Sequence, residues 1–196
     1  MTNFLDDLNP AQREAVENTD GPVLILAGAG TGKTRAITYR IAHLLARGVP
    51  PEALLAVTFT NKAADQMKQR VTDLLVRAGL PSAQPWISTF HSFCARLLRR
   101  EAGHAGLPRD FTIFDDDDQL AAVKLAMANL GMEERRLTPR GVLSRISFAK
   151  NHAQSADELR ANASSDEARQ AARVFEEYEK ILRQSGALDF DDLLLR

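Results

Sequence analysis

Short apolar runs alternate with amphipathic segments over the first hundred residues of the chain. The runs cover residues 23–27, 54–59 and 86–88, and each leads into a segment whose apolar residues recur at helical spacing. The predicted helices extend to Ala46, over residues 61–77 and to Glu101, and are followed by Gly48, Gly79 and Gly103. This repeated order of strand and helix predicts a parallel sheet.

The pattern becomes almost wholly helical after residue 114. Helices are predicted over residues 116–130, 139–150, 155–161 and 166–184, with start signals at 115–118 and at Thr138-Pro139 and stops at Gly131 and Gly186. The expected core residues are Leu120, Val123, Leu125, Met127, Leu130, Val174, Phe175, Tyr178, Ile181 and Leu182. A helical second domain is therefore predicted.

The last nine residues, 188–196, open one more amphipathic segment. Neither a helix cap nor a polar tail follows it. We therefore expect the sequence to be the first part of a longer protein.

The composition is that of a soluble globular chain of one or two domains, with 196 residues, 44% hydrophobic and 26% charged. No apolar run of about 18 residues and no basic, apolar amino terminus occurs, so neither a membrane span nor secretion is predicted. The single Cys94 cannot form an internal disulfide, and a cytoplasmic location is expected.

The two parts of the chain differ in charge, although the net charge is only −1. Residues 1–110 carry 13 Lys and Arg against 10 Asp and Glu, whereas residues 111–196 carry 12 against 16. A site for a polyanion is therefore expected in the first part.

The first apolar run leads into a glycine-rich turn that ends in Gly32-Lys33-Thr34. Gly28, Gly30 and Gly32 allow backbone conformations in which successive N–H groups point inward around phosphates. Lys33 adds a positive charge, Thr34 offers a hydroxyl to Mg²⁺, and the following helix presents its free N–H groups to the same anion. The turn is predicted to bind a nucleoside triphosphate; a glycine turn without a ligand is the alternative.

Hydrolysis on such a loop needs a second acidic residue, at the end of a neighbouring strand, to hold Mg²⁺. One apolar run ends in acid, over residues 111–115. Asp115 to Asp118 also suit the cap and first turn of the next helix, and this role is favoured over metal binding. The missing carboxylate is expected beyond Arg196.

Four segments match, in order and spacing, the motifs of the UvrD/PcrA/Rep group of superfamily 1 DNA helicases, which the whole chain resembles. Residues 8–16 resemble the glutamine motif, 27–35 motif I, 57–64 motif Ia and 86–93 motif Ib. Residues 188–193 resemble the segment in which the family's chain returns to its first motor domain. The resemblance implies an α/β fold: a RecA-like P-loop NTPase sheet, parallel, with helices on both faces and incomplete here, plus an all-helical inserted domain.

The family's nucleotide-binding residues fall on Gln12, Gly28, Ala29, Gly30, Thr31, Gly32, Lys33, Thr34 and Arg35. By resemblance, Gln12 reads the N6/N7 edge of adenine and Arg35 stacks on its face, which implies ATP as the cofactor. Lys33 and Thr34 take catalytic roles, and Thr34 holds Mg²⁺. Without the match in register, Asn9-Pro10 capping a short helix would be the better explanation of Gln12.

The family's DNA-binding residues fall on Thr58, Phe59, Thr60, Asn61, Lys62, Thr89 and His91. Phe59 can stack a base of single-stranded DNA, while its polar neighbours, Thr89 and His91 hold phosphates. Taken alone, Phe59 reads as a core residue, Thr89 as a helix cap and His91 as a solvated side chain. Arg96, Arg99 and Arg100 extend the basic face; Lys150 and His152 are further candidates, for which solvated surface positions are favoured.

The resemblance divides the chain into residues 1–114, the first part of motor domain 1A, residues 115–186, helical domain 1B, and residues 187–196, the start of the return into domain 1A. It implies an ATP-dependent DNA helicase of 3′ to 5′ polarity in DNA repair or replication. Its expected partners are single-stranded DNA, single/double-strand junctions and repair proteins, and these residues alone are expected to bind ATP without hydrolysing it. A small-molecule phosphotransferase and a non-catalytic nucleic-acid-binding module remain as alternatives.

Overall fold

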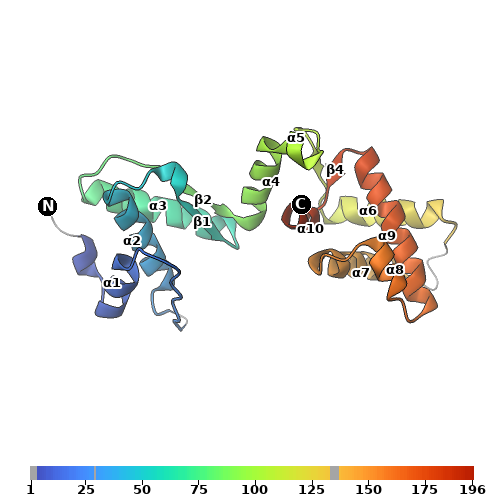
Figure 1. The fold of residues 1–196 in the computed structure, drawn as a ribbon, viewed down its shortest axis with the longest axis horizontal. Coiled ribbons are helices and arrows are strands. Elements are labelled where there is room, and N and C mark those ends of the chain that lie inside the picture. Colours follow the sequence, from blue (N-terminus) through green and yellow to red (C-terminus); the bar gives the residue numbers. More distant parts are fainter. Residues whose placement is uncertain (1–3, 29, 133–136) are drawn as a thin grey trace. The chain divides into compact units, whose positions relative to one another are not determined.

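A computed structural model describes residues 4–28, 30–132 and 137–196. The chain divides into two compact units, Met1–Phe90 and His91–Arg196 (Figure 1). The architecture is mixed α/β and mostly helical, and the described strands form one small parallel sheet in each unit.

The first unit combines helices with a parallel pair of strands (Figure 1). Its described elements are η1 (Phe4–Asp7), α1 (Pro10–Glu17), α2 (Lys33–Ala46), η2 (Pro51–Ala53), β1 (Leu55–Thr58), α3 (Asn61–Arg77) and β2 (Trp86–Thr89). β1 and β2 pair in register, from Leu55 beside Trp86 to Thr58 beside Thr89. Because the strands are parallel, their carboxyl ends share one edge of the sheet, and the residues that follow them lie close together.

The core of this unit is formed by α1, α2, α3 and β2. Val16, Ala42, Val71, Leu75 and Ile87 are all buried in it. The predicted helices up to Ala46 and over residues 61–77 are confirmed, and the core they form fixes the start of α2 and the ends of both strands.

The strand predicted over residues 23–27 was wrong for this chain. Residues 22–28 have no strand pairing, and Leu24 and Leu26 are 83% and 86% exposed. A strand is stable only where a neighbour completes its ladder of hydrogen bonds, and the described strands of this unit, β1 and β2, pair with each other. The apolar composition of the segment was therefore not enough to make it a strand.

The second unit is mostly helical. After α4 (Phe90–Arg100), which starts at the last residue of the first unit, its described elements are α5 (Ala102–Ala105), β3 (Thr112–Ile113), α6 (Asp116–Asn129), α7 (Pro139–Asn151), α8 (Ala156–Ala161), α9 (Asp166–Gln184), β4 (Ala187–Leu188) and α10 (Phe190–Leu195). β3 and β4 pair in parallel, with Thr112 beside Ala187. This pairing joins the two ends of the helical segment α6 to α9.

Helix starts in the second unit follow the predicted caps. The Asp115 carboxylate accepts hydrogen bonds from the backbone N–H groups of Asp117 and Asp118, at 3.0 and 2.9 Å. The Thr138 hydroxyl accepts one from the N–H of Gly141 at 3.2 Å. The favoured capping role of Asp115 is therefore confirmed, and α9 has the predicted bounds.

The helical core consists largely of the predicted residues. Val123, Met127, Val174, Phe175, Tyr178, Ile181 and Leu182 are buried, and Leu120 and Leu130 are half-buried. The prediction was wrong for Leu125, which is 51% exposed. Residues two positions apart in a helix differ by about 200° around its axis. Leu125 therefore lies on the face of α6 opposite to the buried Val123.

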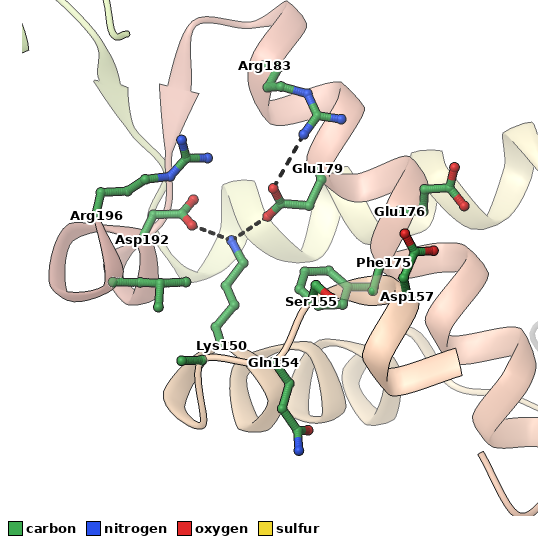
Figure 2. Close-up of a pocket in the computed structure, with 13 residues that line it drawn as sticks. Lys150, Gln154, Ser155, Asp157, Phe175, Glu176, Glu179, Arg183, Asp192 and Arg196 are labelled. Carbon is green, nitrogen blue, oxygen red and sulfur yellow. Dashed lines mark hydrogen bonds and ion pairs between the residues drawn. The ribbon is translucent and has the colours of Figure 1, made fainter. Parts of the chain in front are cut away.

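Lys150 is buried, so the expectation of a solvated surface position was wrong. Its ammonium contacts Glu179 at 2.9 Å and Asp192 at 2.8 Å (Figure 2), and Asp189 at 2.7 Å. Burial acts to lower the pKa of Lys150, but attraction to the three carboxylates outweighs it and raises the pKa. Lys150 thus ties α7 to α9 and α10, whereas His152 is exposed as expected.

Candidate functional site

The glycine turn ends at a helix start that no described side chain caps. Gly30 and Gly32 have φ angles of 76° and 92°, in the left-handed region that residues with a Cβ rarely adopt. Gly32 is the N-cap of α2 and has no side chain that could accept a hydrogen bond from the first N–H groups of the helix. The first N–H groups of α2 are therefore open to an anion, which the helix dipole also favours. Ala29, predicted to belong to this turn, lies outside the described residues.

Lys33, the first residue of α2, folds back over the turn. Its ammonium donates hydrogen bonds to the carbonyl oxygens of Ala27 and Gly28, the second at 2.9 Å. The Thr31 hydroxyl donates to the same Gly28 oxygen at 2.8 Å. The positive charge is thus already held within the turn.

Gln12 contacts the glycine turn from α1. Its amide nitrogen donates to the carbonyl oxygen of Thr31 at 3.2 Å, and its amide oxygen accepts from the N–H of Asn9 at 3.3 Å. A Cβ on Gly32 would lie 2.5 Å from the Gln12 amide nitrogen, so the glycine is needed for this close approach. No other described residue bonds to this amide, so its second hydrogen and the second lone pair of its oxygen can contact a ligand.

A hollow of about 320 Å³ lies beside the turn. Its described lining includes Asn9, Gln12, Ile25, Gly28, Lys33 and Ala36, and Lys33 is its single charged residue. Open N–H groups with one ammonium form a donor set that fits a polyphosphate. Thr34, exposed in the first turn of α2, offers the one hydroxyl expected for Mg²⁺; further oxygen ligands would have to come from phosphate and water.

Arg35 lies on the other side of α2. One of its terminal nitrogens donates to the backbone carbonyl oxygen of Asp7 at 2.7 Å, and its guanidinium carbon is 5.3 Å from the centre of the Tyr39 ring. It lines a second hollow, of about 460 Å³. The structure therefore brings Gln12 and Lys33 to one hollow and Arg35 to a neighbouring one.

Two aromatic rings lie together at the carboxyl ends of β1 and β2. Phe59 follows β1 directly and is 90% exposed; Phe90 follows β2 directly. The ring centres are 5.7 Å apart and the planes are tilted by 45°. Thr58 ends β1 and Thr89 ends β2 beside it, so these two predicted DNA contacts and Phe59 lie at one edge of the sheet.

The remaining predicted DNA-binding residues differ in their exposure. Thr60 caps α3 by accepting a hydrogen bond from the N–H of Ala63 at 3.1 Å, and Asn61 and Lys62 are exposed in the first turn. Thr89 is buried at the end of β2. The solvent-facing group in the first unit is therefore made by residues 59–62 together with Phe90.

His91 and the arginines of α4 belong to the second unit. The His91 ring lies edge-on to Phe190, with centres 5.7 Å apart. The Arg99 guanidinium lies 5.0 Å from the centre of the Phe111 ring. Arg99 is thus engaged within its own unit.

Sequence reasoning missed Phe90, Asp7 and Tyr39. A usable signal existed for Phe90, because a Thr-Phe pair ends the predicted strand 54–59 and another directly follows the predicted strand 86–88. For Tyr39 the signal was its spacing of four residues from Arg35, which places the two side chains together on a helix. Nothing local pointed to Asp7, which meets them only through the tertiary fold.

The described residues contain no helix long and apolar enough to cross a membrane. Among the same residues, no three His, Cys, Asp or Glu side chains are grouped so that they could hold a metal ion. Asp115, the sequence's alternative metal ligand, uses its carboxylate as a helix cap.

Comparison with known proteins gives matches over nearly the whole chain. The family model described as "UvrD/REP helicase N-terminal domain" matches residues 8–196. The chain is 44% identical over 193 residues to the ATP-dependent DNA helicase PcrA of Bacillus subtilis, covering 98% of this chain and 26% of that protein. It is 42% identical over 196 residues to PcrA of Staphylococcus aureus strain Mu50, again covering 26% of that protein. The chain thus spans about a quarter of the length of these relatives.

Proposed function

The chain belongs to the UvrD/REP helicase N-terminal domain family, and from this we propose that it is the ATP- and DNA-binding first part of an ATP-driven DNA helicase. The observation that carries the proposal is the glycine turn, with its lysine and the uncapped start of α2, in the same unit as the exposed rings at the strand ends. A triphosphate and a nucleic-acid strand would each find suitable chemistry there.

For ATP, we assign the phosphates to the turn. The first N–H groups of α2 and the Lys33 ammonium would hold phosphate oxygens and stabilise the charge that develops during transfer. The Thr34 hydroxyl would ligate Mg²⁺, which supplies charge neutralisation between phosphates. Gln12 would pair with the edge of adenine, and Arg35 would stack on its face.

For DNA, we assign the strand ends. Phe59, with Phe90 beside it, would stack a base of single-stranded DNA. Asn61 and Lys62 lie in the first turn of α3, where exposed polar groups can bond to phosphate oxygens. Thr58, Thr60, Thr89 and His91 complete the set that the family resemblance assigns, although the burial of Thr89 limits it to a supporting position.

At the level of the whole protein, we propose the family's arrangement and direction. Residues 1–114 would form part of a RecA-like motor domain 1A, residues 115–186 an inserted helical domain 1B, and residues 187–196 the return to the motor. Translocation would run 3′ to 5′ in DNA repair or replication, with strand junctions and repair proteins as partners. The family match and the helices α6, α7, α8 and α9 support this arrangement.

We further propose that residues 1–196 alone bind ATP but hydrolyse it negligibly. Asp115, the acidic residue that the sequence offered for Mg²⁺, has its carboxylate occupied by two backbone N–H groups. A DNA-stimulated ATPase activity that disappears in Lys33→Ala would contradict this.

Lys33→Ala tests the ATP assignment. Loss of a charge-assisted contact to phosphate should weaken binding of ATP with Mg²⁺ by about ten- to a hundredfold, as measured by calorimetry. Lys68→Ala is the matched control, because Lys68 pairs with Asp65 on the exposed surface of α3. Equal affinities for wild type and Lys33→Ala would refute the assignment.

Phe59→Ala tests the DNA assignment. Stacking on one base contributes about 1 to 3 kcal/mol, so affinity for a short single-stranded DNA should fall roughly five- to a hundredfold. Fluorescence anisotropy of labelled DNA measures it. Val76→Ala, another exposed apolar residue of the first unit, serves as the control. If both variants bind DNA as the wild type does, the strand ends are not the DNA site.

A further inference from the structure

The Arg35 guanidinium is restrained by two neighbours. It donates to the Asp7 carbonyl oxygen at 2.7 Å, and it lies 5.3 Å from the centre of the Tyr39 ring. An arginine side chain samples many rotamers when nothing restrains it, so each contact narrows the orientations of the guanidinium plane. The plane of Arg35 is therefore set by Asp7 and Tyr39.

Asp7 is itself fixed from two further elements. Its carboxylate accepts a hydrogen bond from the Tyr39 hydroxyl of α2 at 3.1 Å and another from Arg77, at the end of α3, at 3.0 Å. The hydrogen bonds from Tyr39 and Arg77 lower the pKa of Asp7, which keeps the acceptor ionised. The carbonyl group that holds Arg35 thus belongs to a residue tied to both helices.

The hollow beside this group suits a planar ring with a polar edge. Tyr39 and Leu74 give it apolar surface, and five of its eight described lining residues are charged: Asp7, Arg35, Arg70, Asp73 and Arg77. A planar ring can lie on the apolar surface while its polar edge meets these charged groups.

We infer that Asp7 and Tyr39 are positioning residues, which fix the Arg35 guanidinium for the base of the bound nucleotide. The inference rests on the proposed ATP site. Tyr39 and the Asp7 carboxylate lie in the second hollow, away from the described lining of the hollow at the glycine turn. Their contribution therefore falls on the part of the binding free energy that depends on the base.

Tyr39→Phe is the direct test, because it removes the hydroxyl that holds Asp7 and keeps the ring beside Arg35. Affinity for ATP should fall about three- to tenfold, the effect of one hydrogen bond, while affinity for inorganic tripolyphosphate stays unchanged. Calorimetry of the 196-residue chain with Mg²⁺ and each ligand measures both. Asp7→Asn should act in the same direction, because it weakens the pairing with Arg77.

Asp65→Asn is the matched control. Asp65 lies on the exposed surface of α3, where its carboxylate pairs with Lys68 at 3.1 Å, and it is not among the described residues that line either hollow. This variant should keep the wild-type ratio of the two affinities. Circular dichroism checks that each variant folds. If Tyr39→Phe does not fold, Asp7→Asn takes its place, and again the affinity for ATP should fall while that for tripolyphosphate stays unchanged.

Four results would overturn the inference. Equal losses for ATP and tripolyphosphate, or no loss for ATP, would make the Asp7 group purely structural. Equal wild-type affinities for the two ligands would show that the base is not bound, while the phosphate-binding turn would stand. If the wild type binds neither ligand, the proposed ATP site fails and the inference fails with it.

Discussion

Three polar side chains of the proposed ATP site donate hydrogen bonds to backbone carbonyl oxygens. Lys33 donates to Ala27 and Gly28, Gln12 to Thr31, and Arg35 to Asp7. Hydrogen bonds of this kind have a modest net free energy, because one acceptor replaces another. When a nucleotide binds, its phosphate or base atoms would replace these carbonyl oxygens as acceptors. Because the three side chains already lie in place, binding would cost less conformational entropy than ordering unrestrained side chains.

Lys150→Met should destabilise the chain by about 3 to 5 kcal/mol, because it leaves buried carboxylates without their cation. The Lys150 side chain is 1% exposed, and Asp189 and Asp192 are buried with it. Urea unfolding followed by circular dichroism measures the change. Lys180→Met, whose ammonium pairs with Glu176 and Glu177 on the surface, should cost less than about 1 kcal/mol.

The pH dependence of this difference follows from the raised pKa of Lys150. A raised pKa means that the folded state holds the proton more tightly, so the stabilisation is complete below the ordinary value of 10.5. It is lost as the pH rises through the higher pKa of the folded state. The difference in free energy of unfolding between wild type and Lys150→Met should therefore shrink only in strongly alkaline solution. A difference that disappears near neutral pH would contradict the buried ion cluster.

At the scale of elements, the sequence predicted helices better than strands because helix signals are local. Asp115 and Thr138 lie within three residues of the N–H groups that they cap, so a short window contained the whole interaction. A strand depends on a partner distant in sequence, and residues 23–27 have none in the described structure. The surface position predicted for Lys150 was wrong for the same reason, since its carboxylate partners Glu179 and Asp192 lie in α9 and α10, far from it in sequence.

The sequence predicted the local parts of the candidate site but not the contacts that join distant residues. The order of the motifs gave the glycine turn, Gln12 and Phe59, because each is a short pattern around a turn or a strand end. The packing of Asp7 against Tyr39 and the pairing of Phe59 with Phe90 join residues that only the fold brings together. Their burial and geometry could not be read from spacing along the chain.

Gly32→Ala should show how far the turn depends on close packing between elements. A left-handed backbone costs a residue with a Cβ about 1 to 2 kcal/mol, and here the new methyl group would also displace the Gln12 amide. Fluorescence of the single Trp86, which lies in the first unit, reports its unfolding in urea. The midpoint should fall, and the bond from Gln12 to Thr31 should be lost with it.

Gly48→Ala separates the effect of backbone strain from the effect of displacing the Gln12 amide. Gly48 has a similar φ of 86°, but a Cβ there would meet nothing within 4 Å, so only backbone strain applies. Gly32→Ala should therefore be the more destabilising variant, and adding Gln12→Ala should recover part of the difference. Equal effects of the two glycine substitutions would mean that the Gln12 side chain moves aside from the new methyl group at no cost in stability.

At the scale of the whole molecule, charge is unevenly distributed along the chain. The excess of Lys and Arg lies within residues 1–110, whereas residues 111–196 carry an excess of acid. Both proposed polyanionic ligands, ATP and DNA, are assigned mainly to the more basic part. Binding of DNA should for this reason weaken as salt concentration rises.

ATP with Mg²⁺ should therefore slow amide hydrogen exchange in one unit only. The strongest protection is expected for the N–H groups of Lys33, Thr34 and Arg35, because phosphate oxygens would replace water as their acceptors. Amides of α6 and α9 should exchange at unchanged rates, since no proposed ATP contact lies in those helices. Mass spectrometry of peptides from both units measures this. Protection that appears in α9 but not at the start of α2 would move the nucleotide site to the second unit.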